Sequence, residues 1–181
     1  DSHFTTGIET VDQQHHKLVD LINRLGNLLV NNEHDQGVMD ALLSELADYA
    51  VYHFSEEESM MAEIGIDQRH LAHHKKLHKD FLLSVTSLKS SLSTDAPDSG
   101  KHLLDFLVHW LAFHILGEDQ GMARQIKKIE TGIKPEEAYE AEERDRSDAM
   151  TPLLAALSGL FEKVSASNLE LLAHNQSLED K

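Results

Sequence analysis

Apolar residues recur every three or four positions along most of this chain, and this spacing limits the possible fold more than any other feature of the sequence. Leu18, Ile22 and Leu25, for example, fall on one face of a helix. The period predicts amphipathic helices over about residues 12–31, 39–63, 67–92 and 103–129. Only 3 Pro and 9 Gly occur in 181 residues, which suits long helices, and no strand-like alternation is present. The expected fold class is all-α, an up-down-up-down four-helix bundle with a C-terminal signalling or coiled-coil helix.

Composition divides the chain into three parts. Residues 1–130 hold the predicted bundle, in which Gly65 separates the second and third helices and Asp67 is expected to cap the third. Residues 131–150 are rich in acidic side chains and are predicted to form a solvated, partly helical connector. Residues 151–181 are predicted to form a heptad helix that leads to an output domain missing from this chain.

The heptad pattern of the last part is regular. Its d positions are all apolar, namely Leu157, Val164, Leu171 and Leu178. Asn168 and Asn175 occupy a positions, and buried Asn at a favours parallel two-stranded coiled coils. We therefore expect a parallel homodimer through residues 152–181. The alternative is that this helix packs on the bundle as a fifth helix.

Charge and composition exclude several classes of function. The formal net charge of −16 disfavours binding to nucleic acid. Cys is absent, which excludes disulfides, thiolate metal sites and Cys nucleophiles. No apolar run reaches the roughly 18 residues of a transmembrane helix, so we expect a cytoplasmic protein with no membrane segment. The 13 His, in contrast, prompt a search for metal ligands.

Seven side chains that can ligate a metal occupy predicted inward-facing positions of the helices. They are His15, His53, Glu57, His74, His78, His114 and Asp119. Residues four apart share a helix face, so His53 pairs with Glu57 and His74 with His78. Burying five imidazoles and two carboxylates without partners would be costly, and a metal centre supplies those partners. For any single His, a hydrogen-bonded core residue is the ordinary alternative.

The other titratable side chains near these positions are expected to lie outside the centre. Most of the remaining His are predicted to be on the surface: His3, His16, His34, His70, His73, His102, His109 and His174. His73 neighbours His74, but it lies five residues before His78, which turns it about 140° from that face. Glu56 and Glu58 are expected to point away from the inner face, and no spare inward acid or base is evident.

These stretches resemble the hemerythrin family in its bacterial form. The matching segments cover about residues 4–129 and read Gly7-Ile8…Val11-Asp12-Gln13-Gln14-His15, His53-Phe54…Glu57-Glu58…Met61, His74…His78…Phe81 and Trp110…His114-Ile115…Asp119. The resemblance implies a four-helix bundle that holds two non-haem iron ions with a bridging oxo or hydroxo group. It further implies that one iron binds to His74, His78 and His114, that the other binds to His15 and His53, and that Glu57 and Asp119 bridge the pair.

The same resemblance implies where an external ligand would bind. The iron held by two His keeps an open position for dioxygen, or for azide or chloride as analogues. Trp110, Leu111 and Ile115 would line the dioxygen pocket and keep water out of it. Ordinary core packing is the alternative reading of these three residues.

The function we expect is that of a di-iron oxygen-binding sensor, which signals oxygen or redox state to a C-terminal output domain. The segment from Leu171 to Glu179 resembles the signalling coiled coils that precede output domains. Bacterial hemerythrin domains occur fused to diguanylate cyclases, which make cyclic di-GMP, and to chemoreceptors. We expect no enzyme activity in the present chain, although a full-length protein could be such a cyclase. The alternatives are an oxygen carrier or store, and a di-iron peroxidase or nitric-oxide-handling enzyme.

Overall fold

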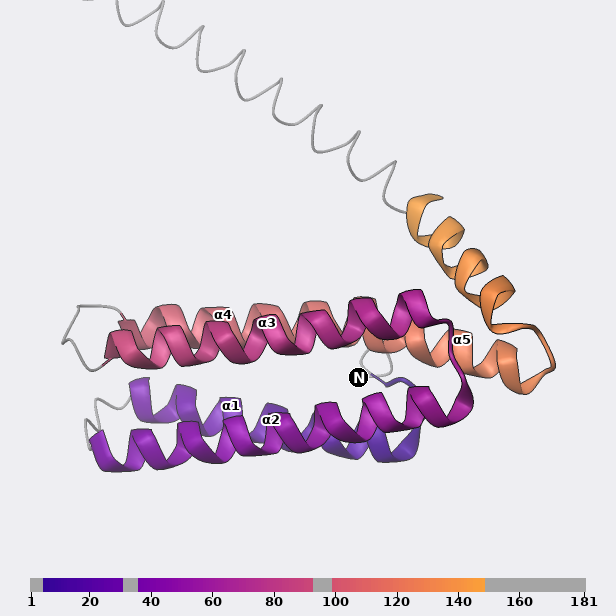
Figure 1. Cartoon of the computed structure of the whole chain (residues 1–181). Helices are drawn as coiled ribbons and strands as arrows, with labels where there is room; N and C mark the ends of the chain where they lie inside the picture. Colours follow the sequence, from indigo (N-terminus) through magenta and orange to yellow (C-terminus); the bar gives the residue numbers. More distant parts are fainter. Residues whose placement is uncertain (1–4, 31–35, 93–98, 149–181) are drawn as a thin grey trace, which may run out of the picture. The chain divides into compact units, whose positions relative to one another are not determined.

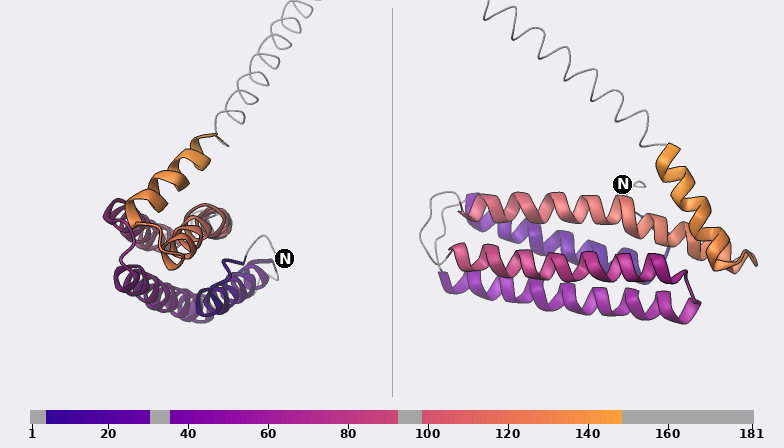
Figure 2. Two further views of the ribbon diagram at one scale, coloured as in Figure 1. Left: turned by 90° about the vertical axis from the view of Figure 1, so that its right-hand side faces the viewer. Right: turned by 45° about the horizontal axis from the view of Figure 1, so that its top comes forward.

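The computed structural model describes residues 5–30, 36–92 and 99–148. Four long helices lie side by side in it (Figures 1 and 2), namely α1 (Glu9–Val30), α2 (Gln36–Ile64), α3 (Gln68–Leu92) and α4 (Ser99–Phe113). The predicted all-α bundle is therefore confirmed, and the first three helices begin and end within a few residues of the expected positions. No helix in these ranges is long and apolar enough to cross a lipid bilayer.

The fourth predicted helix is not continuous, contrary to the expectation. α4 ends at Phe113, a π-helical turn η2 (His114–Asp119) follows, and α5 (Gln120–Glu130) continues from it. A π turn closes i→i+5 hydrogen bonds instead of i→i+4 bonds, so it accommodates an extra residue within the helix. Periodicity of apolar residues did not reveal it, because α4 and α5 are each regular on their own.

The connection between α2 and α3 is short and follows directly from its sequence. Gly65 adopts a φ of 75°, which a residue with a Cβ adopts only at a cost, and the Ile66 N–H donates to the Met61 carbonyl over 3.0 Å. Asp67 then accepts a hydrogen bond from the Arg69 backbone N–H at 2.8 Å. The predicted cap of the third helix is thus confirmed.

Apolar side chains fill the bundle in two separate clusters. The larger cluster occupies most of its length and includes Leu21, Leu25, Leu43, Leu103 and Leu107, all buried. The smaller cluster lies toward the α2–α3 connection and consists of Met61, Ile66, Leu71, Met122 and Ile126. Along α2 the buried polar residues His53 and Glu57 fall between Ala50 and Met61, so a polar layer separates the two clusters.

A turn over residues 131–134 follows α5, and the chain then becomes helical again. Residues 135–148 form a helix, which agrees with the expected partly helical connector. The first compact unit of the chain extends to Tyr139, where the Arg69 guanidinium lies 4.3 Å from the centre of the Tyr139 ring. Ala138 is fully buried. The predicted heptad helix of residues 151–181 lies outside the described residues.

Candidate metal centre

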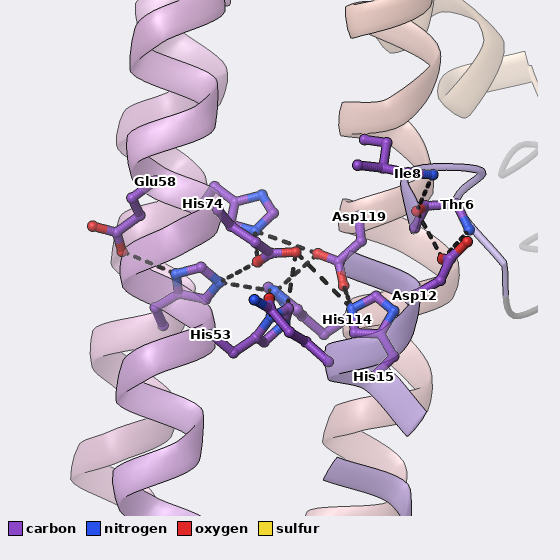
Figure 3. Close-up of polar contacts among 12 residues, drawn as sticks. Thr6, Ile8, Asp12, His15, His53, Glu58, His74, His114 and Asp119 are labelled. Atoms are coloured by element: carbon purple, nitrogen blue, oxygen red, sulfur yellow. Dashed lines mark hydrogen bonds and ion pairs between the residues drawn. The ribbon is translucent and has the colours of Figure 1, made fainter. Parts of the chain in front are cut away.

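Four elements bring the seven predicted ligands to one place in the interior of the bundle (Figure 3). α1 supplies one His, α2 a His and a Glu, α3 two His, and η2 a His and an Asp. The seven are His15, His53, Glu57, His74, His78, His114 and Asp119, and none is more than 4% exposed. The sequence analysis therefore identified a set of side chains that the fold does bring together.

The carboxylate of Glu57 lies between two groups of imidazoles and turns one oxygen toward each. Its Oε1 is 3.9 Å from Nε2 of His15 and 3.6 Å from Nε2 of His53. Its Oε2 is 3.5 Å from Nε2 of His74 and 3.4 Å from Nε2 of His78. A carboxylate in this position can bridge two cations.

Asp119 repeats this arrangement from the opposite side of the bundle. Its Oδ2 lies 2.9 Å from Nε2 of His15. Its Oδ1 lies 3.4 Å from Nε2 of His74 and 3.1 Å from Nε2 of His114. Taken together, the two carboxylates separate two imidazoles, those of His15 and His53, from three, those of His74, His78 and His114.

Two overlapping groups of ligand atoms suit two metal ions. One consists of Glu57, His74, His78 and His114, and the other of His15, His53, Glu57 and Asp119; within each group the ligand atoms lie within 4.8 Å of one another. Several of these buried atoms make only ionic contacts within the cluster and no hydrogen bond of regular geometry among the described residues: His15 Nε2, His74 Nε2, and both carboxylate oxygens of Glu57 and of Asp119. Buried polar atoms are nearly always paired. Cations at the two positions would supply the partners, so the residues fit a dinuclear centre.

The π turn explains how His114 and Asp119 reach the same centre. In a regular α-helix, residues five apart point about 140° away from each other. In η2 the turn is wider, and both side chains are fully buried toward the imidazoles of α1 and α3. The five-residue spacing of His114 and Asp119 therefore suits a single site only because the helix type changes locally. Such π-helical distortions are often found at functional sites.

The metal-free centre is strongly polarised. Burial acts to lower the pKa of His74, but hydrogen bonds and charges from Asp119 and Glu57 outweigh it and raise that pKa to about 9. Burial and Asp119 act to raise the pKa of Glu57, yet hydrogen bonds from His74 and His78 lower it to about 2. For His53 burial prevails and lowers the pKa to about 4. Metal ions bind ionised carboxylates and neutral imidazoles, so Glu57 and His53 are in the binding form at neutral pH, whereas His74 would release a proton when a metal binds.

Contacts around the centre include residues that the sequence analysis did not assign. The Nδ1 atom of His53 lies 2.8 Å from Gln14 Oε1, and that of His78 lies 2.9 Å from Glu58 Oε1. Glu58 does point away from the centre, as expected, but it touches a ligand from outside. The sequence could have indicated these two contacts only through adjacency, because Gln14 is next to His15 and Glu58 is next to Glu57.

Two of the three residues expected in a dioxygen pocket line an apolar pocket of about 190 Å³ between α1 and α4. Leu111 and Ile115 form part of its wall, together with Val19, Ile22, Val108 and Ala112, and Asn23 is its polar member. Trp110 is not among the lining residues. It stacks on the His114 ring instead, with the two ring centres 4.3 Å apart.

The other His residues mostly follow the expectation. His16, His102 and His109 are exposed, whereas His3, His34 and His174 lie outside the described residues. The His73 side chain is 51% exposed while His74 is fully buried, which supports the choice of His74.

His70 and Glu118 depart from the expectation. His70 is only 3% exposed, because it precedes His74 by one helical turn on the inner face, and its Nδ1 lies 3.0 Å from Gln125 Nε2. Glu118 is also 3% exposed and is therefore an inward acid outside the ligand set, which the sequence analysis did not find. Its Oε2 lies 3.6 Å from Nε2 of His73.

Comparison with known proteins agrees with this geometry. The model of the hemerythrin HHE cation binding domain matches residues 6–126. A bacteriohemerythrin of Clostridium acetobutylicum is 36% identical over 122 residues, which cover 65% of this chain and 92% of that protein. A bacteriohemerythrin of Stenotrophomonas maltophilia is 31% identical over 121 residues, covering 67% and 76% of the two chains. A hemerythrin-like protein of Naegleria gruberi is 31% identical over 119 residues, covering 66% and 85%.

Proposed function

The chain belongs to the hemerythrin family, and from this premise we propose that its centre holds two non-haem irons and binds dioxygen. One observation carries the proposal, namely that Glu57 and Asp119 each lie between two sets of imidazoles. One oxygen of each carboxylate faces the set formed by His15 and His53. The other oxygen faces the imidazoles of α3 and η2. Two bridging carboxylates between unequal sets of His define two adjacent metal positions.

The unequal sets also indicate which position takes an external ligand. His74, His78 and His114 fill one side, whereas His15 and His53 supply one imidazole fewer on the other. When bound, a pair of reduced irons supplies the electrons for reversible dioxygen binding. The chain's own contribution is to hold the ligands rigidly and to exclude water, and buried Ile115 is placed to do the latter.

The proposal is tested by loading the protein with iron without oxygen and then admitting oxygen. Elemental analysis should give two irons per chain at saturation, and rapid mixing of the reduced protein with oxygen should produce a transient visible absorption band. Azide added to the oxidised protein should give a related band. A stable ratio of one metal per chain at saturation would refute the two-iron centre, and two irons without any oxygen-dependent band would refute dioxygen binding.

We further propose that the centre acts as a sensor in signalling and not as an enzyme. This proposal rests on the heptad pattern of residues 151–181, which lie outside the described residues. A parallel dimer of these segments would bring two output domains together, for example two diguanylate cyclase domains. Replacing both Asn168 and Asn175 by Ile should strengthen association in sedimentation experiments. If this variant does not associate more strongly at high concentration, the heptad interpretation is wrong.

A di-iron peroxidase is the second candidate, and Glu118 is the observation that favours it. This carboxylate is buried next to Asp119 without belonging to either group of ligand atoms. Peroxide consumption by the iron-loaded protein with an added reductant measures the activity directly. Turnover that is lost in Glu118→Gln at unchanged iron content would favour the enzyme over the sensor.

A further inference from the structure

We infer that Glu58 and Gln14 are positioning residues that give the two halves of the metal centre unequal electron density. The inference rests on the proposed function, because it concerns how the chain tunes the two irons. Its basis is a pair of hydrogen bonds that are alike in geometry and different in charge.

The first step concerns the ring nitrogens of His53 and His78. In both rings Nε2 faces Glu57, at 3.6 Å and 3.4 Å respectively, so Nε2 is the atom available to a metal. The partner of each Nδ1 is an oxygen that can only accept a hydrogen bond, so Nδ1 carries the proton of the neutral ring. It donates to Gln14 Oε1 at 2.8 Å in His53 and to Glu58 Oε1 at 2.9 Å in His78. Such outer contacts fix the tautomer of a ligating His and raise its basicity.

The second step is the difference between the two acceptors. Gln14 offers a neutral amide, whereas Glu58 offers a carboxylate, and hydrogen bonds to an ionised acceptor are roughly twice as strong. The stronger acceptor pulls the Nδ1 proton outward and makes the His78 ring the more electron-rich ligand. Added negative charge favours the more highly charged, oxidised metal ion. Glu58 therefore makes the iron on the side of His78 easier to oxidise than it would be with a neutral acceptor at this position.

The third step separates this charge effect from a structural one. The His78 ring stacks on Phe54, with ring centres 3.8 Å apart and planes inclined by 10°, so packing alone keeps the ring in place. The Glu58 side chain, which accepts the hydrogen bond from His78, is 27% exposed. Its second oxygen, Oε2, lies 3.8 Å from Lys75 Nζ. Exchanging the carboxylate for an amide should leave the ring orientation intact. Removing the Lys75 charge should have the opposite electrical effect.

The redox test uses three variants of the full chain loaded with iron. Glu58→Gln should shift the midpoint potential to a more positive value and slow autoxidation, whereas Lys75→Met should shift the potential to a more negative value. Glu56→Gln is the matched control, because it removes the same charge from an exposed side chain on the other flank of Glu57. Equal shifts for Glu58→Gln and Glu56→Gln would reduce the effect to general surface charge and overturn the inference, as would no shift at all.

A second measurement does not depend on iron. Nitrogen-15 NMR of the metal-free chain should show His78 as the Nδ1–H tautomer, with a strongly deshielded proton that moves upfield in Glu58→Gln. Gln14→Glu should produce the reverse change at His53. An Nε2–H tautomer of His78 in the unaltered chain would refute the inference. If the NMR result holds while the protein fails to bind two irons, the proposed function fails and the positioning role of Glu58 stands.

Discussion

Replacing Glu57 by Ala should remove iron from both positions of the centre at once. The side chain is fully buried, and it turns one oxygen toward His15 and His53 and the other toward His74 and His78. Its loss therefore takes one ligand from each metal. A change at any of the four imidazoles would remove a ligand from one metal only.

The magnitude follows from the same geometry. Even residues that only support a ligand change metal affinity by about 10–100-fold when mutated. Loss of a direct ligand should exceed that range, so we expect at least about 100-fold weaker binding at each position, or about 3 kcal/mol. The metal-free protein changes as well. Glu57 is one of the two carboxylates that raise the pKa of His74 to about 9, so this pKa should fall in the variant.

The assay is the ratio of iron to protein after anaerobic loading and desalting. The unaltered chain and the control Glu56→Ala should both retain two irons, and Glu57→Ala should retain less than one. Circular dichroism establishes that each variant remains helical. Two firmly bound irons in a folded Glu57→Ala would show that this carboxylate does not bridge the metals, and the reasoning from its two oxygens would be wrong.

Four further predictions concern single side chains. His73→Ala should keep both irons because that side chain is half exposed, and loss of iron in elemental analysis would instead assign the ligand role to His73. Ile115→Thr should admit water to the apolar pocket, so optical spectra should show faster autoxidation of the reduced protein than in the matched variant Ile115→Val. Gly65→Ala should lower the free energy of unfolding by about 1–2 kcal/mol in urea titrations, because its φ is 75°; an unchanged midpoint would contradict the role given to this turn. Asp67 has its pKa lowered chiefly by the hydrogen bond from Arg69, so its charge stabilises the fold above the ordinary Asp pKa and this contribution is lost as the pH falls. Asp67→Asn should accordingly destabilise the metal-free protein near pH 7, and this loss should become smaller as the pH falls below the ordinary pKa of Asp, whereas an equal loss at every pH would exclude a charge effect.

The sequence was sufficient to predict the helices and the seven His, Glu and Asp side chains that the fold brings together, because both depend on short spacings. His53 and Glu57, or His74 and His78, share a face of a regular helix, and their apolar neighbours show which face is buried. The cap at Asp67 and the break at Gly65 are likewise local signals. These features need no knowledge of how distant segments meet.

The remaining features depend on contacts between helices or on a departure from regular geometry. The hydrogen bond between His78 and Glu58 joins α3 to α2, and no periodicity within one helix encodes it. Burial of Glu118 follows from the π turn, since a regular helix would place this residue differently. The partner of His70 is Gln125, which lies 55 positions away along the chain.

The π turn also fixes the rotation of everything that follows it. Each residue of a regular helix advances the chain by about 100°, so one residue more or fewer in η2 would turn the buried face of α5 by that angle. Met122 and Ile126 would then leave the smaller apolar cluster, and Asp119 would leave the imidazoles. The number of residues in η2 therefore determines both whether the metal centre has all its ligands and how α5 packs in the bundle. A single-residue deletion in η2 should disrupt both together, whereas a deletion in the segment that connects α3 to α4 leaves this number unchanged.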